Sequence, residues 1–126
     1  MTRVSRVCGT NNVMMNWIEL TSPHQLDEIK KESEMNHVLI FKHSTRCATS
    51  KLSLDRLERN WTAERTAVKP YFLDLLNYRS VSNLVAETFD VEHESPQVLL
   101  IHKGQSILDL SHYAIDYDPI SRAIRN

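Results

Sequence analysis

Apolar runs and amphipathic stretches alternate along most of the chain, which predicts strands and helices in turn. Residues 16–20, 38–41 and 71–76 are short and largely apolar. The run 38–41 (Val-Leu-Ile-Phe) is unbroken, which is typical of a strand buried on both faces of a sheet. Three strands are therefore expected in this part of the chain.

A helix is predicted after each of these strands, because apolar residues then recur at helical spacing. Ser22-Pro23-His24-Gln25 has the pattern of a capping box, with Ser22 as the cap and Pro23 in the first turn of a helix that ends near Glu34. The predicted buried positions of the three helices are Leu26, Ile29 and Met35, then Ala48, Leu52, Leu57 and Trp61, then Val81, Leu84, Val85 and Phe89.

The pattern changes after Ser95-Pro96. Two apolar runs, residues 97–102 and 106–111, are separated by Lys103-Gly104-Gln105, which predicts a hairpin. A last short helix is expected to start at Asp118-Pro119. The alternation implies parallel strands with crossover helices, so we predict an α/β fold of order β-α-β-α-β-α-β-β-α with a central mixed sheet flanked by helices. We expect one domain over residues 16–126, preceded by an N-terminal extension, residues 1–15, that is flexible.

Charge and composition remove several classes of function. The chain has 126 residues, with 15 basic and 16 acidic side chains. Because these charges nearly cancel, no overall field favours nucleic acid or an acidic membrane as a partner. The first ten residues lack the apolar stretch of a signal peptide, and no later run approaches the roughly 18 apolar residues of a spanning helix, so a cytoplasmic protein is expected. Two cysteines cannot form a disulfide framework.

Cys47 is the strongest candidate for chemistry, because it lies where a buried strand gives way to a helix. The first turn of a helix has backbone N–H groups without partners and the positive end of the helix dipole, and both stabilise a thiolate. Arg46 and Lys51 add positive charge nearby. A dithiol catalyst would have a second cysteine three residues later, and Ser50 stands there. These positions therefore indicate one reactive thiol.

The order of the elements, with a cysteine opening the second helix and a proline just before the hairpin, resembles the thioredoxin fold over residues 16–126. In that fold the matching proline is cis and faces the cysteine. The resemblance implies a cis Ser95-Pro96 bond and a role for this peptide in receiving an extended substrate strand.

Four segments together resemble the monothiol bacilliredoxin family of the YtxJ type: residues 43–50, 71–75, 79–83 and 93–100. Family members usually have Thr-Cys-Pro-Ile-Ser around the cysteine, whereas this chain has Arg46-Cys47-Ala48-Thr49-Ser50. The cysteine and the serine three residues later are retained, while Ala48 replaces the proline.

The resemblance implies that Cys47 removes bacillithiol from protein mixed disulfides, with bacillithiol as co-substrate and without a metal. The partners would be S-bacillithiolated proteins and a low-molecular-weight thiol or partner reductase that resets the enzyme, with no nucleic acid and no membrane. The expected supporting residues are Thr45, Arg46, Ser50, Ser95 and Pro96, and the candidates for binding the thiol cofactor are Lys42, His43, Arg46 and Lys51.

Simpler interpretations of single residues remain open at this point. Cys47 could be an inert buried thiol, and Cys8 could be incidental or a resolving thiol. Ser50 could be a helix residue or a donor to the Cys47 thiolate. His43 could be a general base or a partly exposed strand residue, and Asp74 could be a proton relay or a solvated carboxylate.

Two other functions are compatible with the pattern. The first is a non-catalytic thioredoxin-fold adaptor or chaperone that holds extended peptides beside Pro96 by strand addition. The second is a redox sensor whose cysteine is oxidised to sulfenic acid.

Overall fold

The computed structural model describes residues 16–61 and 68–125. The predicted N-terminal extension and Cys8 lie outside this range. The described elements, in chain order, are β1 (Ile18–Glu19), α1 (His24–Glu32), β2 (His37–His43), α2 (Ala48–Asn60), β3 (Val68–Asp74), α3 (Arg79–Phe89), β4 (Gln97–His102), β5 (Gln105–Ser111), the 3₁₀ helix η2 (His112–Ala114) and α4 (Tyr117–Arg125).

The strands form one mixed sheet, as the sequence predicts, in the order β1-β3-β2-β4-β5. β3 runs parallel to both β1 and β2, whereas β4 runs antiparallel to β2 and to β5. β2 is the central strand, and in its register with β4 the residue Lys42 lies opposite Gln97. The C-terminal end of β2 is thereby placed next to the start of β4, directly after Pro96.

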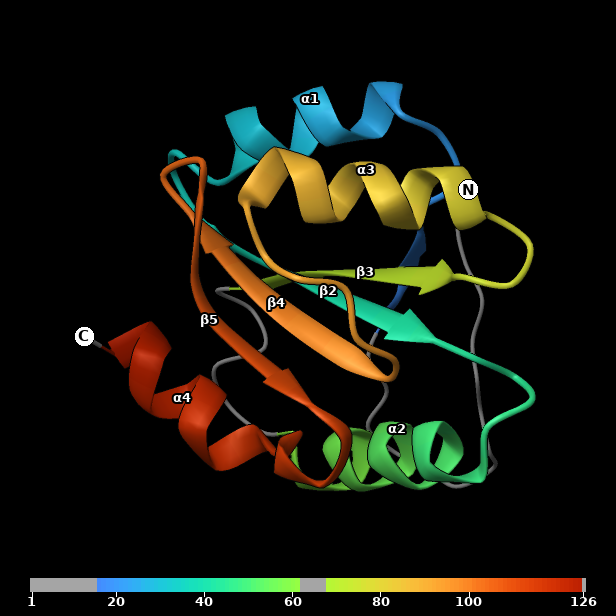
Figure 1. The fold of residues 1–126 in the computed structure, drawn as a ribbon. Helices are drawn as coiled ribbons and strands as arrows, with labels where there is room; N and C mark the ends of the chain where they lie inside the picture. The colour runs from blue at the N-terminus through green and yellow to red at the C-terminus, as the bar shows by residue number, and fades with distance from the viewer. Residues whose placement is uncertain (1–15, 62–67, 126) are drawn as a thin grey trace.

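The sheet is covered on both faces (Figure 1), with α1 and α3 on one side and α2 and α4 on the other. Side chains alternate along β2, so that Val38 and Ile40 join the core on the α1 and α3 side while Leu39 and Phe41 join the core on the other side. All four are fully buried, which explains why this strand has no polar residue between His37 and Lys42.

The hairpin between β4 and β5 turns through Lys103 and Gly104, which both have positive φ, at 55° and 76°. Two central residues of this kind are those of a tight hairpin turn, and a glycine relieves the strain at the second position. Gly104 is held from outside the hairpin, because its N–H donates to Ser33 Oγ at 2.9 Å. The hairpin end is therefore tied to the end of α1.

Some predicted burial is wrong. Met35 is 83% exposed beyond the end of α1, and Leu52 is 66% exposed on α2, where Ala48 is also exposed. The buried face of α2 consists instead of Ser50, Ser53, Leu54 and Leu57. Ser50 and Ser53 can be buried on this face because Ser50 contacts His43 and Ser53 donates to the carbonyl of His112. Apolar spacing alone does not predict the burial of these serines.

The capping box at α1 forms only in part. Gln25 Oε1 accepts the backbone N–H groups of Thr21 and Ser22 at 2.8 and 3.1 Å, as expected for the glutamine of such a box. The predicted cap position is wrong by one residue, because Pro23 and not Ser22 is the N-cap of α1, and no side-chain hydrogen bond caps the helix there.

Among the residues that the structure describes, no helix is long and apolar enough to cross a membrane.

Candidate active site

Cys47 is the N-cap residue of α2, with extended backbone angles of φ −111° and ψ 119°. Its carbonyl accepts the N–H of Lys51 at 3.2 Å, and its own N–H donates to the carbonyl of Ser44 at the same distance. The thiol is free and partly exposed. The sulfur therefore sits at the positive end of a 13-residue helix that has no acidic residue in its first turn. The partial exposure of this thiol argues against an inert buried cysteine.

A small buried network fixes the loop between β2 and α2. Ser50 Oγ accepts the backbone N–H of Ser44 at 3.1 Å and lies 2.7 Å from Nδ1 of His43. Ser50, His43 and Ser44 are 0%, 5% and 8% exposed. Since the carbonyl of Ser44 also accepts the N–H of Cys47, the network reaches the residue that carries the sulfur.

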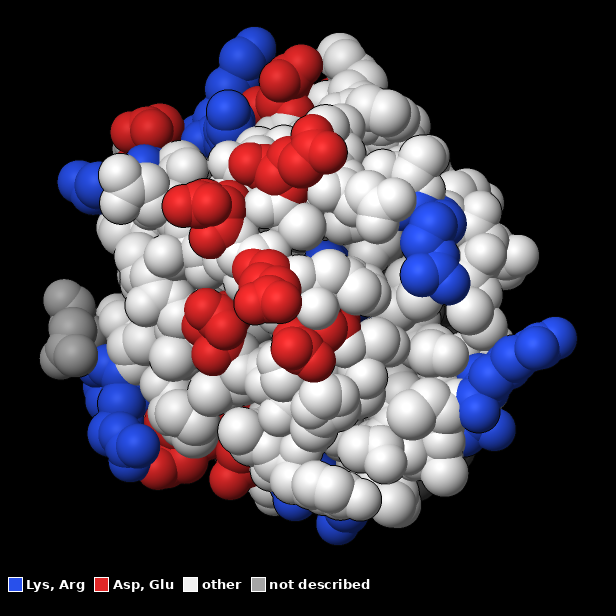
Figure 2. All heavy atoms as spheres, in the orientation of Figure 1, with Lys and Arg blue, Asp and Glu red and all other residues white. Residues whose placement is uncertain are grey.

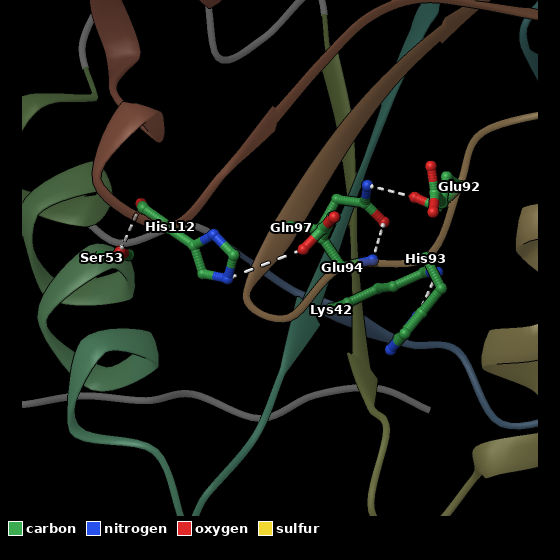
Figure 3. Close-up of polar contacts among 7 residues, drawn as sticks. All are labelled: Lys42, Ser53, Glu92, His93, Glu94, Gln97 and His112. Atoms are coloured by element: carbon green, nitrogen blue, oxygen red, sulfur yellow. Dashed lines mark hydrogen bonds and ion pairs between the residues drawn. The ribbon is translucent and has the colours of Figure 1, made fainter.

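Lys42 is fully buried and points to the face of the sheet that α1 and α3 cover, opposite to the face of its neighbour His43 (Figure 3). Its Nζ lies 3.1 Å from Nδ1 of His93, and Ser82 Oγ on α3 lies 3.4 Å from the same nitrogen. Burial lowers the pKa of Lys42 to about 8. Burial, and then the charges of Lys42 and Arg79, also lower the pKa of His93. The His93 ring is therefore neutral near pH 7 and accepts a hydrogen bond from the ammonium group.

The loop that ends in Pro96 is held by Gln97, which is 1% exposed. Gln97 Nε2 donates to the carbonyl of Glu92 at 3.0 Å, and Gln97 Oε1 accepts the N–H of Glu94 at 3.4 Å (Figure 3). The Ser95-Pro96 bond is cis, as the resemblance implies. The side-chain amide thus replaces the strand pairing that this loop lacks.

His112 joins three parts of the site. Its N–H donates to the carbonyl of Pro96 at 3.1 Å, and its own carbonyl accepts the hydroxyl of Ser53 on α2 at 3.1 Å. Its Nε2 lies 3.8 Å from Glu94 Oε1 (Figure 3). The backbone of His112 has a φ of 54°, which is uncommon for a residue with a side chain. α2, the proline loop and η2 are therefore linked through one residue.

The remaining candidate side chains lie at the surface. Thr45 and Arg46 are exposed in the turn before Cys47, Lys51 is exposed on α2, and Ser95 is partly exposed. The burial of Lys42 and His43, together with their protein partners, argues against the expectation that they contact a ligand from solvent. Figure 2 shows acidic side chains near the middle of the face in view and basic ones toward its edges.

Asp74 has a local structural role. Its carboxylate accepts Nδ2 of Asn77 at 2.8 Å, and its carbonyl accepts the N–H of Tyr78 at 3.0 Å. The carboxylate therefore closes the turn between β3 and α3, which favours the simpler interpretation over a proton relay.

Sequence reasoning missed His93, Gln97 and His112. Their partners lie far along the chain, as with Lys42 and His93, which are 51 residues apart. The one local signal is Gln97, a polar residue directly before the apolar run from Val98 to Ile101. Within residues 16–61 and 68–125, no group of three or more histidine, cysteine or acidic side chains could hold a metal ion.

A comparison with models of protein families shows to which family this chain is related. The family model described as monothiol bacilliredoxin BrxC matches residues 18–120. This chain belongs to that family. The bacilliredoxin match spans every described element from β1 to α3 and both strands of the hairpin, and it includes Cys47 and Pro96. Bacilliredoxin membership supports a role in thiol oxidoreduction.

Solved structures agree on the fold. A thioredoxin-fold protein classed as a candidate oxidoreductase is 25% identical with a TM-score of 0.72, covering 84% of this chain and 91% of that one. Thioredoxin from Trypanosoma brucei brucei is 14% identical with a TM-score of 0.71, covering 89% and 94%. Thioredoxin from Malassezia sympodialis is 17% identical with a TM-score of 0.69, covering 92% and 94%. This bacilliredoxin therefore has a thioredoxin fold.

Proposed function

We propose that this bacilliredoxin is a monothiol oxidoreductase that removes bacillithiol from protein mixed disulfides through Cys47, in a reducing compartment such as the cytoplasm. The observation that carries the proposal is the position of Cys47 as the partly exposed N-cap of α2, with a buried serine three residues later. A single thiolate suffices for exchange through a mixed disulfide, whereas an internal disulfide would need a thiol at position 50.

The exchange is a displacement at sulfur. The Cys47 thiolate attacks the bacillithiol sulfur of the mixed disulfide, and a new disulfide forms between Cys47 and bacillithiol. The original S–S bond breaks, and its electron pair leaves on the thiolate of the repaired protein, which takes a proton from water. A second low-molecular-weight thiol or a partner reductase then attacks the Cys47 adduct and regenerates the Cys47 thiolate.

Positive charge beside the sulfur supports an anionic adduct. Arg46 is exposed next to Cys47, and Lys51 is exposed one turn into α2. We infer that Arg46 binds a carboxylate of the malate-bearing thiol, since a guanidinium can hold both carboxylate oxygens at once. Lys51 contributes a more flexible charge, and the partly exposed Ser95, before the cis bond, is the proposed backbone contact for an extended substrate segment.

The test uses the full-length reduced protein and a bacillithiolated substrate protein, followed by intact mass spectrometry. We expect the adduct mass to move from the substrate to the enzyme in the wild type, and Cys47→Ser to leave the substrate modified. Equal repair by Cys47→Ser and wild type would refute the proposal. Cys8→Ser is the matched cysteine control and is expected to turn over like wild type, because the mechanism needs one thiol.

Transfer of the adduct separates this function from its alternatives. An adaptor would bind the substrate protein and leave its adduct in place. A sensor would react faster with peroxide than with the mixed disulfide.

A further inference from the structure

The hydroxyl of Ser50 has one proton to donate, and its surroundings determine where that proton goes. The backbone N–H of Ser44 can only donate, so it occupies a lone pair of Ser50 Oγ at 3.1 Å. The other partner of Oγ among the described residues is Nδ1 of His43 at 2.7 Å. Ser50 is 0% exposed, so bulk water does not supply another acceptor. The proton therefore points to His43.

The alternative arrangement leaves a buried donor unpaired. If His43 carried its proton on Nδ1, Ser50 Oγ would accept two hydrogen bonds and its own proton would lack an acceptor among the described residues. Buried polar groups without partners are costly in proteins. His43 must consequently accept at Nδ1, which in the neutral ring places the proton on Nε2.

We propose that Ser50 is a positioning residue that holds His43 as the Nε2–H tautomer and clamps the Ser44 turn beneath Cys47, and that it is not a donor to the Cys47 sulfur. The proposal concerns the same site as the proposed function and rests on it for its kinetic consequences. It resolves the role of the serine that stands where a dithiol catalyst has its second cysteine.

The clamp acts on the sulfur through the backbone. Both backbone polar groups of Ser44 are hydrogen-bonded, since its N–H donates to Ser50 Oγ and its carbonyl accepts the N–H of Cys47. Thr45 and Arg46, between these two anchors, are exposed. The orientation of Cys47 at the start of α2 thus depends on a hydroxyl one helical turn further on, which in turn is aligned by the ring at the end of β2.

The first readout is the tautomer of His43, measured by long-range proton–nitrogen NMR of the imidazole rings. The His43 signals are assigned by their loss in His43→Asn. We expect an unprotonated Nδ1 and a protonated Nε2 in the wild type, and a loss of this single preference in Ser50→Ala. A proton on Nδ1 in the wild type would overturn the proposal. This measurement does not depend on any enzymatic activity.

The second readout is a double-mutant cycle on the rate at which Cys47 exchanges with a small uncharged disulfide. Ser50→Ala and His43→Leu should each slow exchange about tenfold, the effect of losing one well-made hydrogen bond. Because both remove the same contact, the double variant should be no slower than the slower single variant. His43→Asn is the matched partner of His43→Leu, since the two side chains have nearly the same shape but asparagine keeps an acceptor near Nδ1.

His43→Asn should recover at least half of the rate that His43→Leu loses. An additive cycle, in which Ser50→Ala slows exchange equally with or without His43, would overturn the proposal and assign Ser50 to the sulfur itself. Absence of exchange in the wild type would instead refute the proposed function, and the tautomer measurement would still decide the role of Ser50.

Discussion

Replacing Lys42 with methionine should stabilise the protein at neutral pH. The side chain is fully buried, its pKa falls from 10.5 to about 8, and the cause is desolvation. A change of this size corresponds to a cost of about 3 kcal/mol for holding the protonated form inside the folded protein. Methionine has a similar length and volume, so it fills the space without a charge.

The gain is reduced by the loss of one hydrogen bond. Lys42→Met removes the donor to His93 Nδ1, which leaves Ser82 Oγ at 3.4 Å as a weaker partner. A hydrogen bond of this kind contributes about 1 kcal/mol. The variant should therefore be more stable than wild type by about 2 kcal/mol at pH 7.

The advantage should disappear as the pH rises. Between pH 8 and 10.5 the unfolded chain keeps the Lys42 proton that the folded protein has lost, so the unfolding free energy of the wild type rises with pH. The wild type gains about 2 to 3 kcal/mol of unfolding free energy from pH 7 to pH 10, and Lys42→Met lacks this gain. The two proteins should have nearly equal stability by about pH 10.

Urea unfolding under reducing conditions at several pH values provides the assay, with fluorescence of the buried Trp17 and Trp61 as the signal. Lys51→Met is the matched control, because Lys51 is exposed and its replacement should change stability little at any pH. A Lys42→Met protein that is less stable at pH 7, by an amount that does not change with pH, would refute the desolvation argument.

Three further predictions concern α2 and the turn before it. Cys47→Ala should change the unfolding free energy by less than about 0.5 kcal/mol in the same assay, since Cys47 is partly exposed and outside the packed core; a large loss would show that the thiol is structural. Leu57→Ala should cost about 2–5 kcal/mol because Leu57 is fully buried, whereas Leu52→Ala should be close to neutral, and the reverse order would contradict the orientation of α2. Arg46→Ala should slow exchange with an anionic low-molecular-weight disulfide about two- to fivefold and leave exchange with an uncharged one unchanged, a difference that should vanish at high salt.

The fold could be predicted because its signals are local. Apolar runs and helical spacing gave the order of strands and helices, and Ser95-Pro96 marked the change to a hairpin. Cys47 could be found in the same way, since a strand followed by a helix start needs only neighbouring residues to be recognised.

The orientation of α2 and the role of Lys42 could not be predicted from local pattern. Ser53 on the buried face of α2 bonds to the carbonyl of His112, 59 residues away, and Lys42 bonds to His93, 51 residues away. Periodicity counts apolar side chains and therefore assigned Leu52 to the core. It cannot recognise that a serine or a lysine is buried when the partner comes from a distant loop.

The end of β2 makes the site sensitive to insertions and deletions in a particular way. Lys42 and His43 are neighbours in the sequence, but they serve opposite sides of the sheet, the first reaching His93 and the second Ser50. A change of one residue within β2 would exchange these sides and place an ammonium group beneath the helix that carries the thiol. A change of two residues would preserve the assignment. The chemistry at Cys47 thus depends on whether the number of residues in the strand below it is odd or even.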